Sequence, residues 1–195
     1  MVTDSHHRVC PVERARGLDS RIRRWLQNPQ RLLRPYIEEG MTVLDLGCGP
    51  GFFSLDMARM VGTSGRVIAA DLQDGMLQKL ESKIHGTELS DRVTLHKCGK
   101  NRISLSEDVD FILAFYVVHE VPNQEELFAE LETFLKPNGH VLVVEPPFHV
   151  SKTAFEETIR IASEARLTDV MRPRVFLSKA VLLEKGTQQK GHSMT

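Results

Sequence analysis

Residues 43–54 read Val-Leu-Asp-Leu-Gly-Cys-Gly-Pro-Gly-Phe-Phe-Ser, and this stretch decides the fold. The apolar residues on both sides of Asp45 predict a buried strand, and the residues that follow Phe52 predict an amphipathic helix. Gly47, Gly49 and Gly51 lie between the two. Glycine is favoured where the chain turns tightly or where a ligand must touch the backbone. The stretch therefore predicts a parallel strand that turns directly into a helix beside a bound ligand.

The spacing of these glycines indicates the kind of ligand. A dinucleotide-binding turn follows G-x-G-x-x-G and leaves a helix N-terminus open to a pyrophosphate. Here the glycines alternate, and Phe52 stands where the third dinucleotide glycine would be. Asp45 would repel a phosphate, whereas it would attract an ammonium group. A ligand with an aminoacyl end, a nucleoside end and no phosphate satisfies both observations, and S-adenosylmethionine (SAM) is such a ligand.

Further motifs follow in order within residues 40–145. Residues 67–71 predict a second strand that ends in an acid, Asp71, 20 residues after Gly51. Residues 110–115 predict another apolar strand, and residues 135–144 (Leu-Lys-Pro-Asn-Gly-His-Val-Leu-Val-Val) predict a turn that leads into a further one. Together with residues 43–54, these segments resemble the class I SAM-dependent methyltransferases, in particular those of ubiquinone and menaquinone biosynthesis.

The resemblance implies a set of cofactor-binding residues. Asp45 would bind the ammonium group of SAM, the glycine turn would run along the methionyl part, and Asp71 would bind both ribose hydroxyls. Leu72 and Met76 would contact the adenine. The full predicted set is Asp45, Gly47, Cys48, Gly49, Gly51, Phe52, Asp71, Leu72, Met76, Cys98, Gly99 and Phe115.

One position departs from the family pattern. In the third loop many relatives carry an acid that binds the adenine amino group. This chain has Lys97-Cys98-Gly99-Lys100 there, so that contact must come from the backbone or from another element.

The residues that would face the methyl acceptor follow the strand at 110–115. Tyr116, His119 and Glu145 are the predicted catalytic residues. His119 could act as a general base near neutral pH, or it could pack against the following helix. Tyr116 would line the pocket. Glu145 would contact the acceptor or pair with a nearby cation, and Glu120 is predicted to be a structural acid bonded to backbone or to an arginine.

The alternation of strands and helices predicts an α/β, Rossmann-like, doubly wound sheet. The resemblance adds a seven-stranded order, 3-2-1-4-5-7-6, with an antiparallel last strand pair and helices on both faces. The expected strands are 42–47, 66–71, 92–96, 110–115, 140–145, 167–172 and 178–184. Two short helices are expected between residues 11 and 37, and the expected helix N-caps are Asn28, Asp74, Asn123 and Ser151. The length of 195 residues predicts one domain, with a basic helical cap at 1–37, a core at 40–185 and a flexible tail at 186–195.

Composition restricts the possible partners. The net charge is −1, no run of 18 apolar residues occurs, and the three cysteines lack metal-ligand spacing. We therefore expect a cytoplasmic protein that does not bind a membrane and holds no metal. Eight arginines between residues 8 and 34 form either a solvated helical face or part of a pocket for an anionic acceptor. No basic-aromatic stacking pattern indicates nucleic-acid binding.

These observations predict an enzyme that transfers the methyl group of SAM to a small-molecule acceptor. Two alternatives remain at this point: a nicotinamide-dependent oxidoreductase on a similar fold, and a SAM-binding module without catalytic activity. The acceptor, the atom methylated and the oligomeric state are not predicted.

Overall fold

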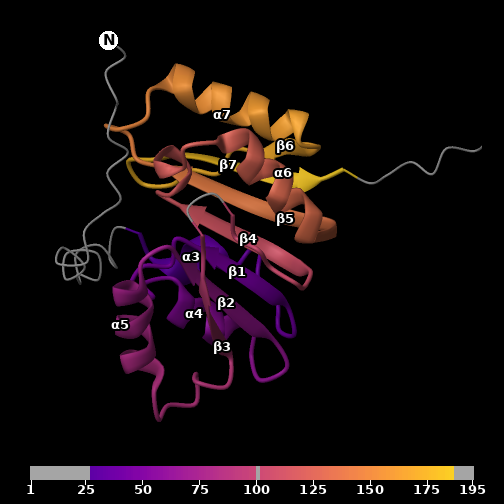
Figure 1. Cartoon of the computed structure of the whole chain (residues 1–195). Helices are drawn as coiled ribbons and strands as arrows, with labels where there is room; N and C mark the ends of the chain where they lie inside the picture. The colour runs from indigo at the N-terminus through magenta and orange to yellow at the C-terminus, as the bar shows by residue number, and fades with distance from the viewer. Residues whose placement is uncertain (1–26, 100–101, 187–195) are drawn as a thin grey trace, which may run out of the picture.

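The computed structural model of the chain describes residues 27–99 and 102–186. Seven strands form one sheet in the order β3-β2-β1-β4-β5-β7-β6 (Figure 1). The strands are β1 (Thr42–Leu46), β2 (Arg66–Asp71), β3 (Val93–Lys97), β4 (Val109–Phe115), β5 (Leu135–Glu145), β6 (Leu167–Met171) and β7 (Lys179–Lys185). Strands β1 to β5 pair in parallel, whereas β7 runs antiparallel to both β5 and β6. The predicted strand order and the mixed sheet are confirmed.

Helices cover both faces of this sheet. They are α3 (Pro29–Leu33), α4 (Ser54–Met60), α5 (Asp74–Ile84), α6 (Gln124–Phe134), α7 (Lys152–Glu164) and the short 3-10 helix η2 (Val118–Glu120). Alternate strand residues point to opposite faces, which divides the buried residues into two cores. Leu44 and Ile112 pack with α6 and α7, while Val43 and Phe111 pack with α3, α4 and α5.

Local sequence signals explain where several helices begin. The Asn28 side chain accepts a hydrogen bond from the Arg31 amide ahead of Pro29, and Asn123 and Ser151 cap α6 and α7 in the same way. These three predicted caps are confirmed. The predicted cap at Asp74 is wrong, because Gln73 is the N-cap of α5 and makes no side-chain capping bond. Asp74 instead pairs with Lys97 at 2.8 Å.

Strand β5 begins five residues earlier than expected. Its first residue, Leu135, pairs with Val109, and regular pairing resumes only at His140 opposite Phe111. The intervening residues 136–139 form an irregularity within the strand pair, with Asn138 at a φ of +61°. The residues that predicted a turn before the strand therefore lie inside it.

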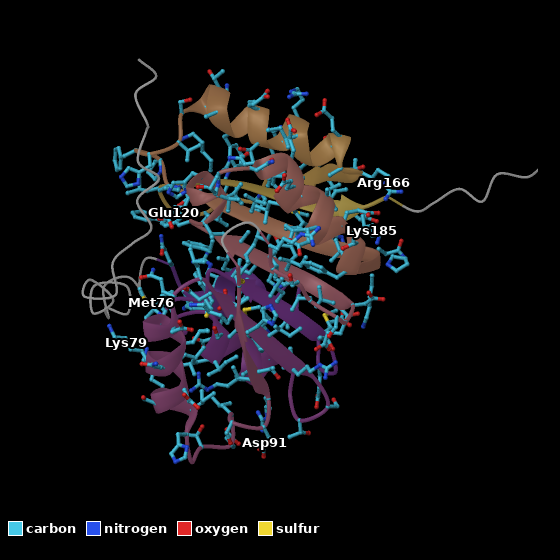
Figure 2. The ribbon with its side chains drawn as sticks, viewed as in Figure 1. Met76, Lys79, Asp91, Glu120, Arg166 and Lys185 are labelled. Atoms are coloured by element: carbon cyan, nitrogen blue, oxygen red, sulfur yellow. The ribbon has the colours of Figure 1, made fainter. Side chains whose placement is uncertain are left out.

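Strands β2 and β3 lie on one side of β1 in the sheet, and strands β4 to β7 lie on the other side. Because β1 neighbours β2 and β4, the chain reverses its direction of winding between β1 and β4. Ligands in such sheets bind beyond the carboxyl ends of the strands at this point. Figure 2 shows Met76 and Glu120, from the two halves of the fold, at this same end of the sheet.

The predicted N-terminal cap and C-terminal tail remain predictions. Most of the basic cap at 1–37 and of the tail at 186–195 lies outside the described residues, and so does the first of two short helices expected between residues 11 and 37. Within the described ranges, no helix combines the length and apolar character needed to cross a bilayer.

Candidate active site

The glycine turn after β1 is built from backbone in a conformation that side chains disfavour. Gly47, Gly49 and Gly51 have φ angles of +70°, +54° and +85°. The amides of Gly47 and Cys48 both donate to the Ala70 carbonyl, at 2.8 and 3.0 Å, and so tie the turn to the end of β2. The turn is therefore held to the end of β2 by main-chain hydrogen bonds.

The three glycines meet different surroundings. A Cβ atom on Gly47 would lie 2.8 Å from Val117 Cγ2, and one on Gly51 would lie 2.3 Å from Leu80 Cδ1. A Cβ atom on Gly49 would have no neighbouring atom within 4 Å. Glycine at 47 and 51 therefore permits close packing within the protein, whereas the space above Gly49 is open to a ligand.

Two buried carboxylates flank this turn. Asp45 accepts a hydrogen bond from Ser54 Oγ at 2.5 Å. Asp71 Oδ2 accepts from the Gly49 amide at 2.9 Å, and its Oδ1 accepts from the Gln73 amide at 2.8 Å. Burial raises the pKa of Asp71, and the amide hydrogen bonds oppose that shift. Since a carboxylate offers about four acceptor positions, Asp71 keeps acceptor capacity for a further ligand donor.

A cavity of about 570 Å³ lies over the turn, and its size is that of a small-molecule site. Every predicted cofactor-binding residue except Gly51 lines it. Cys48 and Cys98 form part of the wall as buried thiols, and burial raises the pKa of Cys98 to about 12. These cysteines therefore present neutral, weakly polar surface to a ligand.

Tyr116 joins three segments at the cavity wall. It lines the cavity, directly follows β4, and has a φ of +61°, which is unusual for a residue with a side chain. Its hydroxyl lies 2.9 Å from Gln27 Nε2, which donates to it, and 2.6 Å from Ser178 Oγ. The Tyr116 amide donates to the Val144 carbonyl at 2.8 Å. Contacts with residues far apart in the chain thus hold this strained position.

His119 and Glu145 lie together, and neither lines the cavity. Glu145 is buried at the end of β5, and its Oε2 lies 2.5 Å from His119 Nδ1. Its Oε1 accepts from the His119 amide at 3.2 Å. Burial of the ring lowers the pKa of His119, but the hydrogen bond and charge of Glu145, with the charge of Glu120, outweigh it, so the pKa is raised overall. Glu145 thus holds both the ring and the backbone of His119.

Two acidic residues of the cavity wall, Glu120 and Glu130, were not among the predicted site residues. Glu120 lines the cavity, and no hydrogen bond or ion pair joins its carboxylate to another residue within 27–99 and 102–186. The expectation that it bonds to backbone or to an arginine is therefore not met among those residues.

Glu130 also lines the cavity, and it accepts from the amides of Ile103 and Ser104 at 2.9 and 2.8 Å. Its charge raises the pKa of Cys98, so an acid from α6 stands near Lys97, Cys98 and Gly99, a segment that contains no acid. No local motif marks either glutamate, because each belongs to the cavity only through the packing of its element.

Comparison with known proteins agrees with this geometry. A family model described as a methyltransferase domain matches residues 37–190. A SAM-dependent methyltransferase from Aquifex aeolicus has a similar structure, with a TM-score of 0.83 and 27% identity over 91% of this chain and 100% of that one.

Two relatives are similar in sequence over a shorter region. The demethylmenaquinone methyltransferase of Lactobacillus johnsonii is 29% identical over 110 residues, which cover 56% of this chain and 45% of the relative. The ubiquinone/menaquinone biosynthesis C-methyltransferase UbiE of an Enterobacter species is 30% identical over 110 residues, 56% of this chain and 44% of that relative. The matched region thus spans less than half the length of these relatives. On its family match, sheet order and glycine turn, the chain belongs to the class I SAM-dependent methyltransferases.

Proposed function

We propose that this chain transfers the methyl group of SAM to a small-molecule acceptor bound in the cavity. The observation that carries the proposal is the open space above Gly49, in a cavity that Asp45 and Asp71 also line. In that position a bound SAM would have backbone along its methionyl part, a carboxylate for its ammonium group and a second carboxylate for its ribose. Leu72 and Met76 would contact its adenine, and they line the same cavity.

The role of the protein in this reaction is mainly positional. SAM supplies a methyl group that is already activated by its sulfonium. The chain must hold the acceptor in line with the methyl–sulfur bond, at roughly 3 Å, and keep water out. The aromatic cluster of Phe53, Phe115 and Tyr116, with ring centroids 4.4 to 4.5 Å apart, supports the second task. Tyr116 is the predicted catalytic residue that lies in the cavity wall, and we assign it to acceptor positioning.

We assign His119 and Glu145 a structural role next to the cavity, because they contact each other and neither lines it. Because Glu145 occupies Nδ1 and the amide of His119, we assign the pair to holding η2 in place. The relatives named for quinone biosynthesis favour an aromatic small-molecule acceptor. An anionic acceptor, action in the cytoplasm, and no binding to membranes or nucleic acid remain predictions from composition.

Calorimetric titration of the full chain tests the proposal. We expect SAM and S-adenosylhomocysteine to bind with dissociation constants in the micromolar range and NADH not to bind. Binding of NADH without SAM would instead support a nicotinamide-dependent oxidoreductase. Release of S-adenosylhomocysteine should then be measured with a set of small aromatic hydroquinones and amines. Tight SAM binding without release above background would favour a non-catalytic SAM-binding module.

A further inference from the structure

Glu120 differs from every other carboxylate in the cavity wall. Asp45, Asp71 and Glu130 each accept hydrogen bonds from the protein. Glu120 lines the same cavity, but its carboxylate receives no hydrogen bond or ion pair from the part of the chain that the structure describes. Among those described residues nothing replaces the water that a half-buried acid loses, and such a loss costs free energy. A ligand that donates to it would recover that cost.

Hydrogen bonds hold the backbone around Glu120 in place. The Glu120 amide donates to the Val117 carbonyl at 3.0 Å and closes the η2 turn. The preceding residue, His119, is held at its ring and its amide by the buried Glu145. His119 contacts Glu145 at the end of β5, whereas the next residue along η2, Glu120, lines the cavity. The position of Glu120 thus depends on the contact between His119 and Glu145.

The surroundings of Glu120 favour proton uptake. Burial raises the pKa of Glu120, the negative charges of Glu145 and Asp71 raise it further, and His119 opposes them. A carboxyl group with a raised pKa is a stronger base than an exposed glutamate. Glu120 also follows β4 by only a few residues, and it lines the same cavity as Tyr116.

We propose that Glu120 binds the proton-bearing N–H or O–H group of the acceptor and takes its proton during methyl transfer. This inference rests on the proposed function. As the acceptor's heteroatom loses its proton to Glu120, its electrons, directly or through a conjugated ring carbon, form the bond to the methyl carbon. The methyl–sulfur bond breaks with its electron pair on sulfur. The products are the methylated acceptor, S-adenosylhomocysteine and one proton, which Glu120 later releases to water.

Binding measurements with sinefungin test the placement of Glu120 without a known acceptor. Sinefungin carries an amine where SAM carries its methylsulfonium, whereas S-adenosylhomocysteine has a neutral sulfur there. We expect Glu120→Gln to weaken sinefungin binding about tenfold, which is about 1.4 kcal/mol, and to leave S-adenosylhomocysteine binding within about twofold. Glu125→Gln, an exposed acid in the first turn of α6, is the matched control and should change neither affinity.

The outcomes separate this inference from the proposed function. An unchanged ratio of the two affinities in Glu120→Gln would overturn the inference, and so would an equal loss of both. If the unaltered chain binds neither compound, the proposed function itself fails.

Turnover of two probes then distinguishes the acceptor classes. 1,4-Naphthohydroquinone offers O–H groups, and benzylamine offers N–H groups. With whichever probe the unaltered chain methylates, Glu120→Gln should lower turnover about 100-fold while the KM for SAM stays unchanged. Equal turnover would overturn the role of Glu120 in proton transfer. Should neither probe react, the ratio of sinefungin to S-adenosylhomocysteine affinity decides the inference.

Discussion

The turn after β1 and the turn after β4 lie at the same edge of the sheet, yet they are built differently. The first consists of three glycines with positive φ angles, held by main-chain hydrogen bonds to Ala70. The second places side chains, Tyr116 and Glu120, in the cavity wall. Their directions depend on contacts with distant residues, such as Ser178 and, through His119, Glu145. The first turn is therefore shaped by the absence of side chains, whereas the second is shaped by the directions that its side chains take.

The largest effect should come from adding a side chain above the glycine turn. We expect Gly49→Val to weaken SAM binding more than about 100-fold, because the valine would occupy the open space in which no atom lies within 4 Å. Gly86→Val is the matched control. Gly86 also has a positive φ, +69°, and open space around it, but it does not line the cavity. Titration calorimetry should show normal SAM affinity for the control. Normal affinity in Gly49→Val would refute the backbone-built cofactor side.

A smaller loss should follow removal of the second-strand acid. We expect Asp71→Ala to weaken SAM binding by about 1–3 kcal/mol, because charge-assisted hydrogen bonds to the ribose are lost. The same change releases the amides of Gly49 and Gln73, so the melting temperature should be measured alongside the affinity. Asp74→Ala, which removes an exposed acid nearby, should leave SAM affinity unchanged. Unchanged affinity in Asp71→Ala would show that the ribose binds elsewhere.

Gly51→Ala sharpens the difference between a ligand-facing glycine and a packing glycine. The new Cβ atom would lie 2.3 Å from Leu80 Cδ1 at a φ of +85°, so we expect a loss of about 1–3 kcal/mol in the free energy of unfolding. SAM affinity of the folded protein should change far less than in Gly49→Val. Urea unfolding and calorimetry would measure the two quantities separately. Full stability combined with abolished SAM binding would contradict the assignment of Gly51 to packing.

The smallest effect concerns pH and the acceptor side. His119 has a raised pKa in the folded protein, so its protonated form stabilises the fold. That contribution is complete below the ordinary histidine pKa of about 6.5 and is lost as the pH rises through the higher folded value. We expect His119→Ala to lose on the order of 1 kcal/mol of stability at pH 5.5 and less at pH 8.5. A stability difference that grows toward pH 8.5 would contradict the His119–Glu145 pairing.

Much of the fold could be predicted because its signals are local. Apolar strand runs, alternating glycines and the caps at Asn28, Asn123 and Ser151 each act within a few residues. The early start of β5 could not be predicted in this way. Leu135 joins the strand because Val109 is available opposite it, and the four residues that follow are accommodated by an irregular pairing.

The candidate site also combines residues that could be predicted from local motifs with residues that only the packing of the fold brings to the cavity. The cofactor-binding residues were predicted from motif positions, and all except Gly51 lie in the cavity wall. Of the predicted catalytic residues, Tyr116 lies there, whereas His119 and Glu145 contact one another beside it. Glu120 is next to His119 in the chain, but the two side chains have different surroundings. No sequence pattern distinguishes which of two adjacent polar residues in a short turn reaches a cavity.

The sequence by itself determined the sheet, the turn after β1 and the class of cofactor, because glycine spacing and apolar periodicity act through the backbone over short distances. Only the tertiary structure decided which acids line the cavity and which glycine has open space beside it. Those outcomes depend on Leu80, Val117 and Glu145, which approach the turns from elsewhere in the chain. Side-chain direction is a property of packing, and packing is complete only when the strands are assembled.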